Sequence, residues 1–487
     1  MKRQTGKFSL ILAAVIFANL VSCGSEPGEI GGGEDSTSAE ATTEPETSPL
    51  KLPEMTFEGK ELRFLSRAIT DTVVRYYSEI AVSEENGETM NDAVYRRTVA
   101  IEDQYKVKLV NDVSEDVTGT FTNSFMAGDD NWDVIVGGFS KMIGVAVNGG
   151  YFADLSSLPY IDFDNPWWDK RVADDLSISG RVFTAIGAMN TWTDSHTYAV
   201  IFNKELAEQY SVDAYGMVDR NEWTLDNFSA ILKNVTNDLD GNGEWDENDR
   251  YGACSEYFNF LVHMTGCGAQ IMSHNKDGIP EYSFDERFYS AAEKVTAMMT
   301  GGDCLLAEAY SYKESDPWTN IIRKNFRAGN SLFYVGGIEQ LLIFRDLETD
   351  IGLLPMPKYD ASDEYAHTFN TSWSSIMSIS ALSSQQEMAA YLLEAMNYQS
   401  SICDSLDYYD IVLSRKAMRD EDSIRMLEIV RSTRTMNFEY AFSFLNLRNI
   451  YNSIIKAKDA STLASSIASS LTAAEEQVAA MVEKINA

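Results

Sequence analysis

The stretch Glu61-Leu-Arg-Phe-Leu-Ser66 reads as a β-strand and begins the folded part of the chain. A helix is expected over 91–105, with Asn91 as its N-cap. Its buried face should carry residues at three- and four-residue spacing, namely Val94, Thr98, Ile101 and Tyr105. Two further strands are expected at 107–110 and 133–139. This alternation at crossover-length spacing predicts βαβ units and a mostly parallel sheet.

The same alternation continues toward the C-terminus. Further strands are expected at 197–202, 332–335, 351–354 and 374–379. Thr224 should cap a helix whose apolar positions are Leu225, Phe228, Ile231, Leu232 and Val235. The last helix is expected over 462–487, with one apolar stripe formed by Leu463, Ile467, Leu471, Val478, Met481 and Ile485.

Length and charge bound the class of protein. The 487 residues are enough for two or three domains, and the hydrophobic content of 44% is that of a globular chain. A formal net charge of −35 repels nucleic acid and anionic headgroups. We therefore expect no nucleic-acid partner and no membrane contact beyond a lipid anchor.

The N-terminus has the order of a signal peptide. Three basic residues, Lys2, Arg3 and Lys7, precede an apolar run over 8–18 that is too short to span a bilayer. The run closes on Leu20-Val21-Ser22-Cys23, which looks like a lipobox. Residues 1–22 are therefore predicted to be a lipoprotein signal peptide, with Cys23 lipidated and the protein held at the extracellular face of the cell membrane. An ordinary cleaved signal with an incidental cysteine is the alternative.

Residues 23–56 are predicted to be a flexible linker. From Gly24 to Pro49 the chain consists almost entirely of Gly, Ser, Thr, Glu, Ala and Pro. Such a segment cannot bury enough apolar surface to offset the entropy of ordering.

Cysteine and histidine offer no metal-type spacing. Beyond Cys23 the cysteines are Cys254, Cys267, Cys304 and Cys403. An exported chain permits disulfides, and four cysteines allow three full pairings, which the sequence leaves open. The four histidines are scattered and are expected to be surface or packing residues.

The stretch 238–249 matches an EF-hand calcium loop through its first six positions. Gly243 supplies the sharp turn, and position 12 is Asp249 instead of glutamate, one methylene shorter. The predicted ligands of a structural Ca²⁺ are Asp238, Asp240, Asn242, Glu244, Asp246 and Asp249. A surface turn without metal is the alternative.

Aromatic residues are abundant and signatures of catalysis are not. Tryptophans expected in loops are Trp167, Trp168, Trp192, Trp318 and Trp373. Flat rings suit stacking on the C–H face of a sugar. Core or lobe packing is the favoured role of any single tryptophan, so the cluster supports a carbohydrate cleft only as a group. The sequence contains no Gly-x-Ser-x-Gly, no phosphate-binding glycine loop and no His-Glu-x-x-His. A carboxylate pair for glycoside cleavage stays open, because its spacing is spatial and not sequential.

Several short motifs, taken in order, resemble the extracellular solute-binding proteins of family 1, the sugar-binding lipoproteins of ABC importers. They are Asn91-Asp-Ala-Val-Tyr95, Asp154-Leu-Ser-Ser-Leu-Pro-Tyr160, Pro166-Trp-Trp-Asp169, Phe202-Asn-Lys-Glu-Leu206, Trp223-Thr-Leu-Asp226, the loop ending Arg250-Tyr-Gly252, Gly352-Leu-Leu-Pro-Met-Pro-Lys358, Leu393-Glu-Ala-Met396, Tyr408-Tyr-Asp410 and Arg419-Asp-Glu421. Each motif alone is weak, but their order over residues 57 to 440 is specific.

The resemblance implies an α/β, two-lobed, periplasmic-binding-protein-like (type II) fold with a hinge and an interlobe cleft. The lobes would comprise 57–197 with 373–418, and 198–372 with 419–487. The hinge crossings would fall near 197–200, 373–378 and 418. In such proteins the ligand contacts both lobes only when they close.

The function implied is a lipid-anchored, monomeric receptor that delivers a sugar or oligosaccharide to the transmembrane subunits of an ABC permease. It would not be an enzyme. Candidate ligand contacts near strand ends or lobe junctions are Arg67, Phe139, Trp192, Trp318, Tyr334 and Trp373. The alternatives are a surface-anchored glycoside hydrolase or lyase and a carbohydrate-binding adhesin or sensor.

Overall fold

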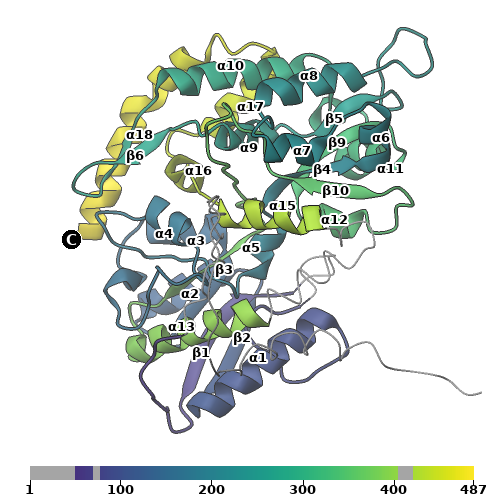
Figure 1. The fold of residues 1–487 in the computed structure, drawn as a ribbon. Coiled ribbons are helices and arrows are strands. Elements are labelled where there is room, and N and C mark those ends of the chain that lie inside the picture. Colours follow the sequence, from purple (N-terminus) through teal and green to yellow (C-terminus); the bar gives the residue numbers. More distant parts are fainter. Residues whose placement is uncertain (1–49, 70–76, 404–420, 487) are drawn as a thin grey trace, which may run out of the picture. The chain divides into compact units, whose positions relative to one another are not determined.

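The computed structural model describes residues 50–69, 77–403 and 421–486 (Figure 1). Several predictions lie outside these ranges: the signal peptide 1–22, Cys23, most of the linker 23–56, the motif 408–410 and the crossing near 418. Among the described helices, none is both long and apolar enough to cross a membrane.

A four-stranded sheet forms the first lobe. Its order is β11-β3-β1-β2, with bounds β1 Glu61–Arg67, β2 Lys108–Ser114, β3 Val134–Gly138 and β11 Ser375–Ile379. β1 pairs in parallel with both β2 and β3, which confirms the predicted βαβ unit. β11 returns from far along the sequence and pairs antiparallel to β3.

Helices cover both faces of this sheet. They are α1 Thr89–Tyr105, α2 Val117–Ala127, α3 Phe139–Ala146, the short 3₁₀ turn η2 Leu155–Ser157, α4 Lys170–Asp175, α5 Thr191–Ser195 and α13 Gln386–Ile402. The buried stripe predicted for α1 is confirmed, but Asn91 is not its cap. The Glu88 carboxylate accepts from the backbone N–H groups of Met90 and Asn91, so the helix begins two residues earlier than predicted.

A five-stranded sheet forms the second lobe. Its order is β10-β4-β9-β5-β8, with bounds β4 Tyr198–Asn203, β5 Tyr251–Ser255, β8 Cys304–Leu306, β9 Ser331–Gly337 and β10 Ile351–Leu354. β5 runs parallel to β8 and β9, whereas β4 runs antiparallel to β9 and β10. Strands β10, β9, β5 and β8 therefore run in one direction, so the sheet is mostly parallel as predicted, with β4 as the exception. The direction of β4 was not predictable, because a strand buried on both faces reads as the same apolar run in either direction.

The helices of the second lobe and its hairpin account for most of the remaining chain. The helices are α6 Lys204–Gln209, α7 Ala214–Asp219, α8 Leu225–Val235, α9 Asn259–Gly266, α10 Glu286–Thr300, η3 Ala307–Tyr310, the π-helix η4 Trp318–Arg323, α11 Lys324–Arg327, α12 Gln340–Ile343, α15 Glu421–Ser432, α16 Phe438–Phe442, α17 Leu447–Ala457 and α18 Leu463–Asn486. The hairpin strands are β6 Met272–His274 and β7 Pro280–Tyr282. Thr224 caps α8 as predicted, and all its predicted apolar positions are buried except Ile231.

The last helix joins the two lobes. α18 (yellow in Figure 1) packs its predicted stripe in the core of the second lobe, with Leu471 only partly buried. Its final turn reaches the first lobe, where Arg181 Nη1 donates to the carbonyl of Ile485 at 2.8 Å. The loop between β6 and β7 contacts the same first-lobe loop that carries Arg181, since Ser179 N donates to the carbonyl of Gly278 at 2.8 Å.

Three chain segments lie side by side between the sheets, namely 196–198, 367–370 and 433–435. We call them the junction. Tyr198 N donates to the carbonyl of Thr368 at 2.9 Å, and Asn370 N donates to that of His196 at 3.0 Å. His367 N donates to the carbonyl of Thr433 at 3.0 Å. Burial lowers the pKa of His367 to about 3, so its imidazole is neutral and accepts from Met356 N.

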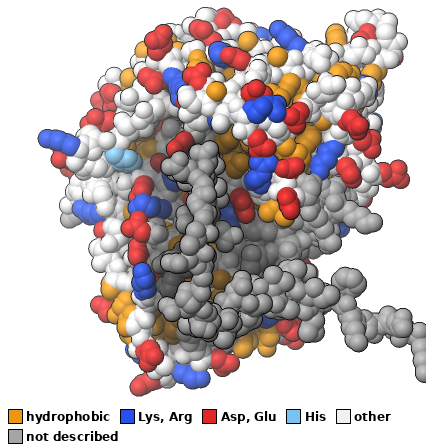
Figure 2. Space-filling view, in the orientation of Figure 1, with side chains coloured by type: hydrophobic (Ala, Val, Ile, Leu, Met, Phe, Trp, Pro, Cys, Tyr) orange, Lys and Arg blue, Asp and Glu red, His pale blue; other side chains and the backbone are white. Residues whose placement is uncertain are grey.

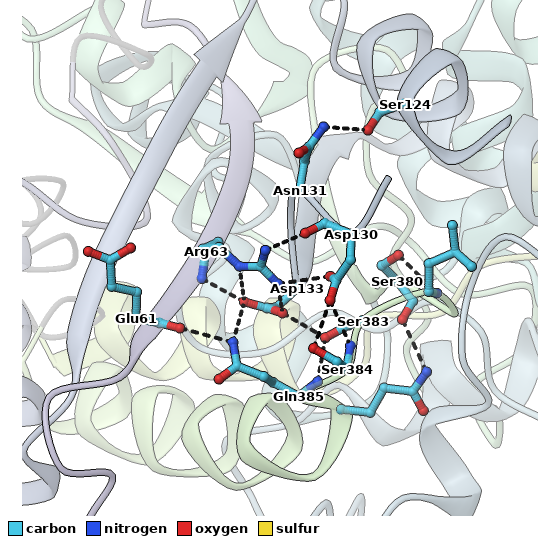
Figure 3. A network of polar contacts seen from close by, with 12 residues as sticks. Glu61, Arg63, Ser124, Asp130, Asn131, Asp133, Ser380, Ser383, Ser384 and Gln385 are labelled. Atoms are coloured by element: carbon cyan, nitrogen blue, oxygen red, sulfur yellow. Dashed lines mark hydrogen bonds and ion pairs between the residues drawn. The ribbon is translucent and has the colours of Figure 1, made fainter. Parts of the chain in front are cut away.

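A buried charge network fixes the frame of the first lobe (Figure 3). The Asp133 carboxylate, which is 0% exposed, accepts from Arg63 Nε at 3.0 Å and from Arg63 Nη2 at 2.7 Å. Ser383 Oγ, just ahead of α13, donates to the same carboxylate at 2.6 Å. β1, β3 and the start of α13 are thereby tied together through one carboxylate.

The four cysteines Cys254, Cys267, Cys304 and Cys403 are free thiols. Burial raises the pKa of the Cys254 and Cys267 thiols to about 12, so both are neutral. They serve as small apolar packing groups in the second lobe.

Candidate functional site

A cavity with a volume of about 640 Å³ lies at the end of the second-lobe sheet, and we call it the main cavity. Its walls come from β4, β9, η4, α12, the residues after β5 and the segment that leads into β11. Its lining includes aromatic, charged and other polar side chains, namely His196, Tyr198, Glu256, Phe258, Trp318, Arg323, Tyr334, Glu339, Gln340, Asn370, Trp373 and Arg448. The volume lies in the range of small-molecule sites.

Sheet topology explains why the cavity lies here. β5 and β9 are parallel neighbours, so their carboxyl ends meet at one edge of the sheet. Glu256 directly follows β5, and Gly336 and Gly337 end β9. Ligands of open α/β sheets bind beyond the carboxyl ends of the strands.

Two tryptophans present partly exposed rings to the main cavity. Trp318, the first residue of η4, is 36% exposed, and Trp373, in the segment before β11, is 45% exposed. The His196 imidazole lies roughly parallel to the indole of Trp373, with ring centroids 6.5 Å apart. Exposed, oriented indole faces can stack on the apolar face of a sugar ring.

A half-buried carboxylate orients one of these rings. Trp318 Nε1 donates to Glu256 Oε2 at 2.7 Å, and the Tyr198 hydroxyl donates to Glu256 Oε1 at 3.2 Å. Asn370 Nδ2 in turn donates to the Tyr198 hydroxyl at 3.1 Å. Burial raises the pKa of Glu256, while the hydrogen bonds from Trp318 and Tyr198 oppose that rise.

A second carboxylate, Glu339, also lines the main cavity. Glu339 Oε1 accepts from Gln340 Nε2 at 2.9 Å, and Arg323 Nε donates to Gln340 Oε1 at 2.9 Å. Glu339 Oε2 is buried and has no hydrogen-bond partner among the described residues. Burial raises the pKa of Glu339 to about 7, because its charged form is poorly solvated.

Two smaller cavities adjoin the main one. One, of about 250 Å³, is lined by α3, α16 and α17 and shares Phe258, Ser372 and Arg448 with it. The other, of about 210 Å³, holds Arg67, Ser140 and Lys141 and shares Ser372. Polar groups of the first lobe therefore lie next to the main cavity.

The structure gathers three of the six predicted ligand residues around the main cavity: Trp318, Tyr334 and Trp373. Tyr334 is 3% exposed, so only its edge is available. Arg67 lies in the adjoining 210 Å³ cavity, donates to the carbonyl of Trp373 at 3.3 Å and stands over the indole of Trp192.

The other two predicted residues lie in the core. Phe139 is 0% exposed and packs edge to face on Phe369, with ring centroids 5.0 Å apart. Trp192 is 2% exposed, and its backbone N–H donates to Glu79 Oε1 at 2.7 Å. Direct contact with a ligand would require either side chain to leave its packing.

Sequence reasoning did not single out Tyr198, Glu256, Glu339, Asn370 or Arg448. A signal for Glu256 exists, because a carboxylate directly after a strand that is parallel to its neighbours falls at the ligand edge of a sheet. The strand itself was not predicted, so that signal could not be used. No local pattern marks Asn370 or Arg448.

The loop 238–249 has the geometry of a cation loop. Asp238 Oδ1 accepts from Gly241 N at 2.7 Å and Asp238 Oδ2 accepts from Gly243 N at 2.8 Å. Gly241 and Gly243 have φ of +70° and +80°, which favours glycine at both turns. Carboxylate oxygens of Asp238, Asp240 and Asp249 lie within 4.8 Å of one another. Oxygens gathered in this way fit the ligand preference of Ca²⁺.

Asp249, at the twelfth position of the loop, differs from an EF-hand glutamate in that both its carboxylate oxygens accept from backbone N–H groups of the loop. It is 3% exposed, accepts from Leu239 N at 3.0 Å and from Asp246 N at 2.8 Å, and so closes the loop onto itself. Asn325 Nδ2 holds the carbonyls of Glu247 and Asp249, each at 3.0 Å. Asn325 thereby ties the end of the loop to the second lobe.

Charges of both signs are interspersed over the face drawn in Figure 2. No broad basic patch is visible there, which agrees with the strongly negative net charge of −35. A surface of this kind is unsuited to a nucleic-acid backbone.

No protein-family profile and no curated protein sequence matches the chain. Solved structures do. UspC of M. tuberculosis has a TM-score of 0.56 at 13% identity, covering 85% of this chain and 100% of its own. A sugar transporter from Rhizobium etli in an open conformation has a TM-score of 0.55 at 13% sequence identity, and the match covers 88% of this chain and 99% of the transporter chain. An ABC substrate-binding protein from Listeria monocytogenes in complex with cycloalternan has a TM-score of 0.50 at 14% sequence identity, and the match covers 88% of this chain and 98% of the Listeria chain.

Similarity at these identities shows the fold. The chain has the two-lobed α/β fold of periplasmic-binding-protein-like sugar-binding proteins, so the predicted fold class is confirmed. The resemblance to family 1 solute-binding proteins is confirmed at the level of the fold.

Proposed function

We propose that the protein is the solute-binding receptor of an ABC importer and that it captures a carbohydrate, of oligosaccharide size, in the main cavity. One observation carries the proposal. Trp318, from a helix of the second lobe, and Trp373, from the segment entering the first-lobe sheet, present partly exposed indoles to one cavity of about 640 Å³. Two aromatic faces with polar groups between them suit a sugar, which has apolar ring faces and a polar rim.

The fold supports this proposal, since solved structures with the same fold include proteins in complex with cycloalternan and with maltotetraose. These ligands belong to those proteins. For this chain they favour a saccharide over other small molecules as the first class to test.

A binding role fits the site better than hydrolysis. Glycoside cleavage needs two carboxyl groups that face the glycosidic bond. Both oxygens of Glu256 accept hydrogen bonds from protein side chains, and the free oxygen of Glu339 is buried. Neither carboxylate is therefore arranged to protonate or attack a substrate in this conformation.

Location and partners follow from the N-terminal sequence. The lipobox ending at Cys23 supports lipid anchoring at the extracellular face of the membrane, with 24–49 as a spacer. A receptor held there would deliver its sugar to the transmembrane subunits of the permease as a monomer. Mass spectrometry of the membrane fraction tests the anchor, since Cys23→Ala should abolish acylation and release the protein.

We further propose that the loop 238–249 binds a structural Ca²⁺. The three carboxylates Asp238, Asp240 and Asp249 would supply charge, and Asn242, Glu244 and Asp246 the remaining positions. Extracellular sites of this type bind calcium at ~10⁻⁴–10⁻³ M. The ion would hold the loop against the second lobe and would take no part in binding the sugar.

Titration calorimetry with a panel of saccharides tests the receptor role. Maltotriose, cellotriose, xylotriose and raffinose are suitable first probes. A probe at about 100 times its dissociation constant should add ~2.7 kcal/mol to the free energy of unfolding. Chromatography of each probe after incubation separates the alternatives: a probe recovered unchanged supports the receptor, whereas shorter products overturn it in favour of a hydrolase.

A further inference from the structure

The indole of Trp318 is held in place although it is partly exposed. Trp318 is 36% exposed and begins the π-helix η4, yet its Nε1 donates to the half-buried carboxylate of Glu256 at 2.7 Å. A hydrogen bond to an ionised acceptor is stronger than one between neutral groups. The bond therefore restricts the plane of the ring at the cavity wall.

The same carboxylate continues toward the junction. Its other oxygen accepts from the Tyr198 hydroxyl at 3.2 Å, and Asn370 Nδ2 donates to that hydroxyl at 3.1 Å. Tyr198 begins β4, and Asn370 lies in a second segment of the junction. The hydrogen-bond chain thus crosses from the second lobe into the junction.

Asn370 organises the turn that carries Trp373. Its side-chain oxygen accepts from Ser372 N at 3.0 Å, and its carbonyl accepts from Trp373 N at 3.3 Å and from Ser374 N at 3.0 Å. One amide side chain therefore contacts Tyr198 with its nitrogen and shapes the Trp373 turn with its oxygen.

We propose that Glu256 is a positioning residue of the saccharide site and that the chain Trp318–Glu256–Tyr198–Asn370 sets the two indoles of Trp318 and Trp373 at a fixed separation and tilt. The inference rests on the proposed function for its ligand, a stack of pyranose rings. Preset rings lose little rotational entropy when a sugar binds, so affinity and the choice between sugars depend on this network.

Protonation should weaken the network. The ionised carboxylate accepts from both Trp318 and Tyr198, whereas a protonated carboxyl loses its charge and is a weaker acceptor at the oxygen that carries the proton. Burial and the nearby charge of Glu339 raise the pKa of Glu256, whereas the hydrogen bonds from Trp318 and Tyr198 and the charge of Arg448 lower it. The net shift is upward, so this loss begins at a higher pH than for an ordinary glutamate. Saccharide affinity should therefore fall as the pH is lowered.

Glu308 offers a matched control. It is a neighbouring half-buried carboxylate whose pKa is raised by desolvation to about 7, and it accepts from the backbone N–H of Tyr257 at 2.9 Å. It does not line the main cavity. Glu308→Gln removes a similar charge without touching either tryptophan.

Indole NMR tests the network without any ligand. In protein labelled with ¹⁵N at tryptophan, Trp318→Phe and Trp373→Phe identify the two resonances. Glu256→Gln and Tyr198→Phe should each move the Trp318 indole proton upfield, Asn370→Ala should move both resonances, and Glu308→Gln should move neither. An unchanged Trp318 resonance in Glu256→Gln, or an Asn370→Ala effect confined to Trp373, overturns the network. Thermal unfolding of each variant shows that it is folded.

Binding of the saccharide panel then tests the positioning role. Glu256→Gln should weaken the best-bound saccharide about tenfold or more in the wild-type background. The same Glu256→Gln substitution should have little further effect on affinity in the Trp318→Ala background. If Glu256 acts through Trp318, the effects of the two substitutions on the binding free energy are not additive. Equal weakening in both backgrounds overturns the positioning role. Failure of the wild-type protein to bind any saccharide, with the NMR shifts present, instead refutes the proposed function.

Discussion

Arg181 Nη1 donates to the backbone carbonyl of Ile485 at 2.8 Å and thereby fastens a loop of the first lobe to the last turn of α18. Arg181 Nη2 adds a bond to the side chain of Asn486 at 2.7 Å. Gly149 lies beside the same turn, where a Cβ would fall 2.8 Å from the carbonyl oxygen of Lys484. The close approach requires glycine and marks this contact as tightly packed.

Arg181→Ala should loosen this contact without unfolding the protein. Loss of two hydrogen bonds at a half-buried site should lower the free energy of unfolding by about 1–2 kcal/mol. Amide hydrogen exchange should become faster in 178–181 and 484–486. Arg220→Ala, which removes only the exposed pairs with Asp213 and Glu222, is the control. Unchanged exchange at both segments would mean that α18 is held by its apolar stripe alone.

Asp133→Ala should be among the most destabilising substitutions in the first lobe. It removes a fully buried carboxylate that accepts from Arg63 and from Ser383, while Arg63 keeps its ion pair with Asp130. Hydrogen bonds to a charged group contribute about 1.5–3 kcal/mol each. Chemical denaturation measures the change. Asp164→Ala, at an exposed pair with Lys170, should leave stability nearly unaltered. Equal effects from the two variants would contradict the role assigned to the network in Figure 3.

Trp318→Ala and Trp373→Ala should each weaken saccharide binding about tenfold or more, because each removes a stacking face from the main cavity. Trp245, at 52% exposure in the loop 238–249, is a matched control for losing a surface indole. Calorimetry of the three variants with the same saccharide distinguishes the loss of an indole that lines the main cavity from the loss of any surface indole. A loss as large in Trp245→Ala would place the binding site elsewhere.

Calcium should stabilise the wild-type protein and not Asp238→Asn. At about ten times its dissociation constant the ion should add ~1.4 kcal/mol to the free energy of unfolding. Thermal shift with CaCl₂, reversed by EGTA, measures this gain, and MgCl₂ serves as the control cation. Asp277→Asn, on the hairpin loop between β6 and β7, should keep the wild-type response. A response retained in Asp238→Asn would rule out this loop as the site.

Glu79→Gln should flatten the pH dependence of stability. Burial raises the pKa of Glu79 from 4.5 to about 7, so between these values the folded protein binds more protons than the unfolded chain. Stability therefore falls as pH rises through this window. A shift of this size corresponds to roughly 3 kcal/mol across the window. Urea denaturation at pH 5 and pH 8 should show this fall in the wild type and a smaller fall in Glu79→Gln; equal falls would contradict it.

Regular elements with a strong local pattern were predictable from sequence. The stripes of α1 and α18 and the cap of α8 are confirmed because helical periodicity and an N-cap hydroxyl act over only a few residues. Asn91 failed as the α1 cap because Glu88, three residues earlier, reaches the same N–H groups. The three-residue strands β6, β7 and β8 have too short a pattern to be distinguished from loops.

Site residues were less predictable. Trp318 and Trp373 are predicted ligand contacts and both line the main cavity, whereas Phe139 and Trp192 carry the same aromatic signal and lie in the core. An aromatic side chain is equally suited to packing and to stacking on a ligand. The packing environment of the ring decides between these roles, and that environment is formed by residues distant in the sequence.

The sequence alone determined the βαβ start of the fold, the amphipathic faces of its long helices and the oxygen-rich loop 238–249, because these depend on residues a few positions apart. Tertiary structure decided the direction of β4, the burial of Phe139 and Trp192, and the joining of Trp318 to Trp373 through Glu256 and Asn370. Strand order and hydrogen bonds between distant segments are set by how the two sheets meet, and no local pattern encodes that meeting.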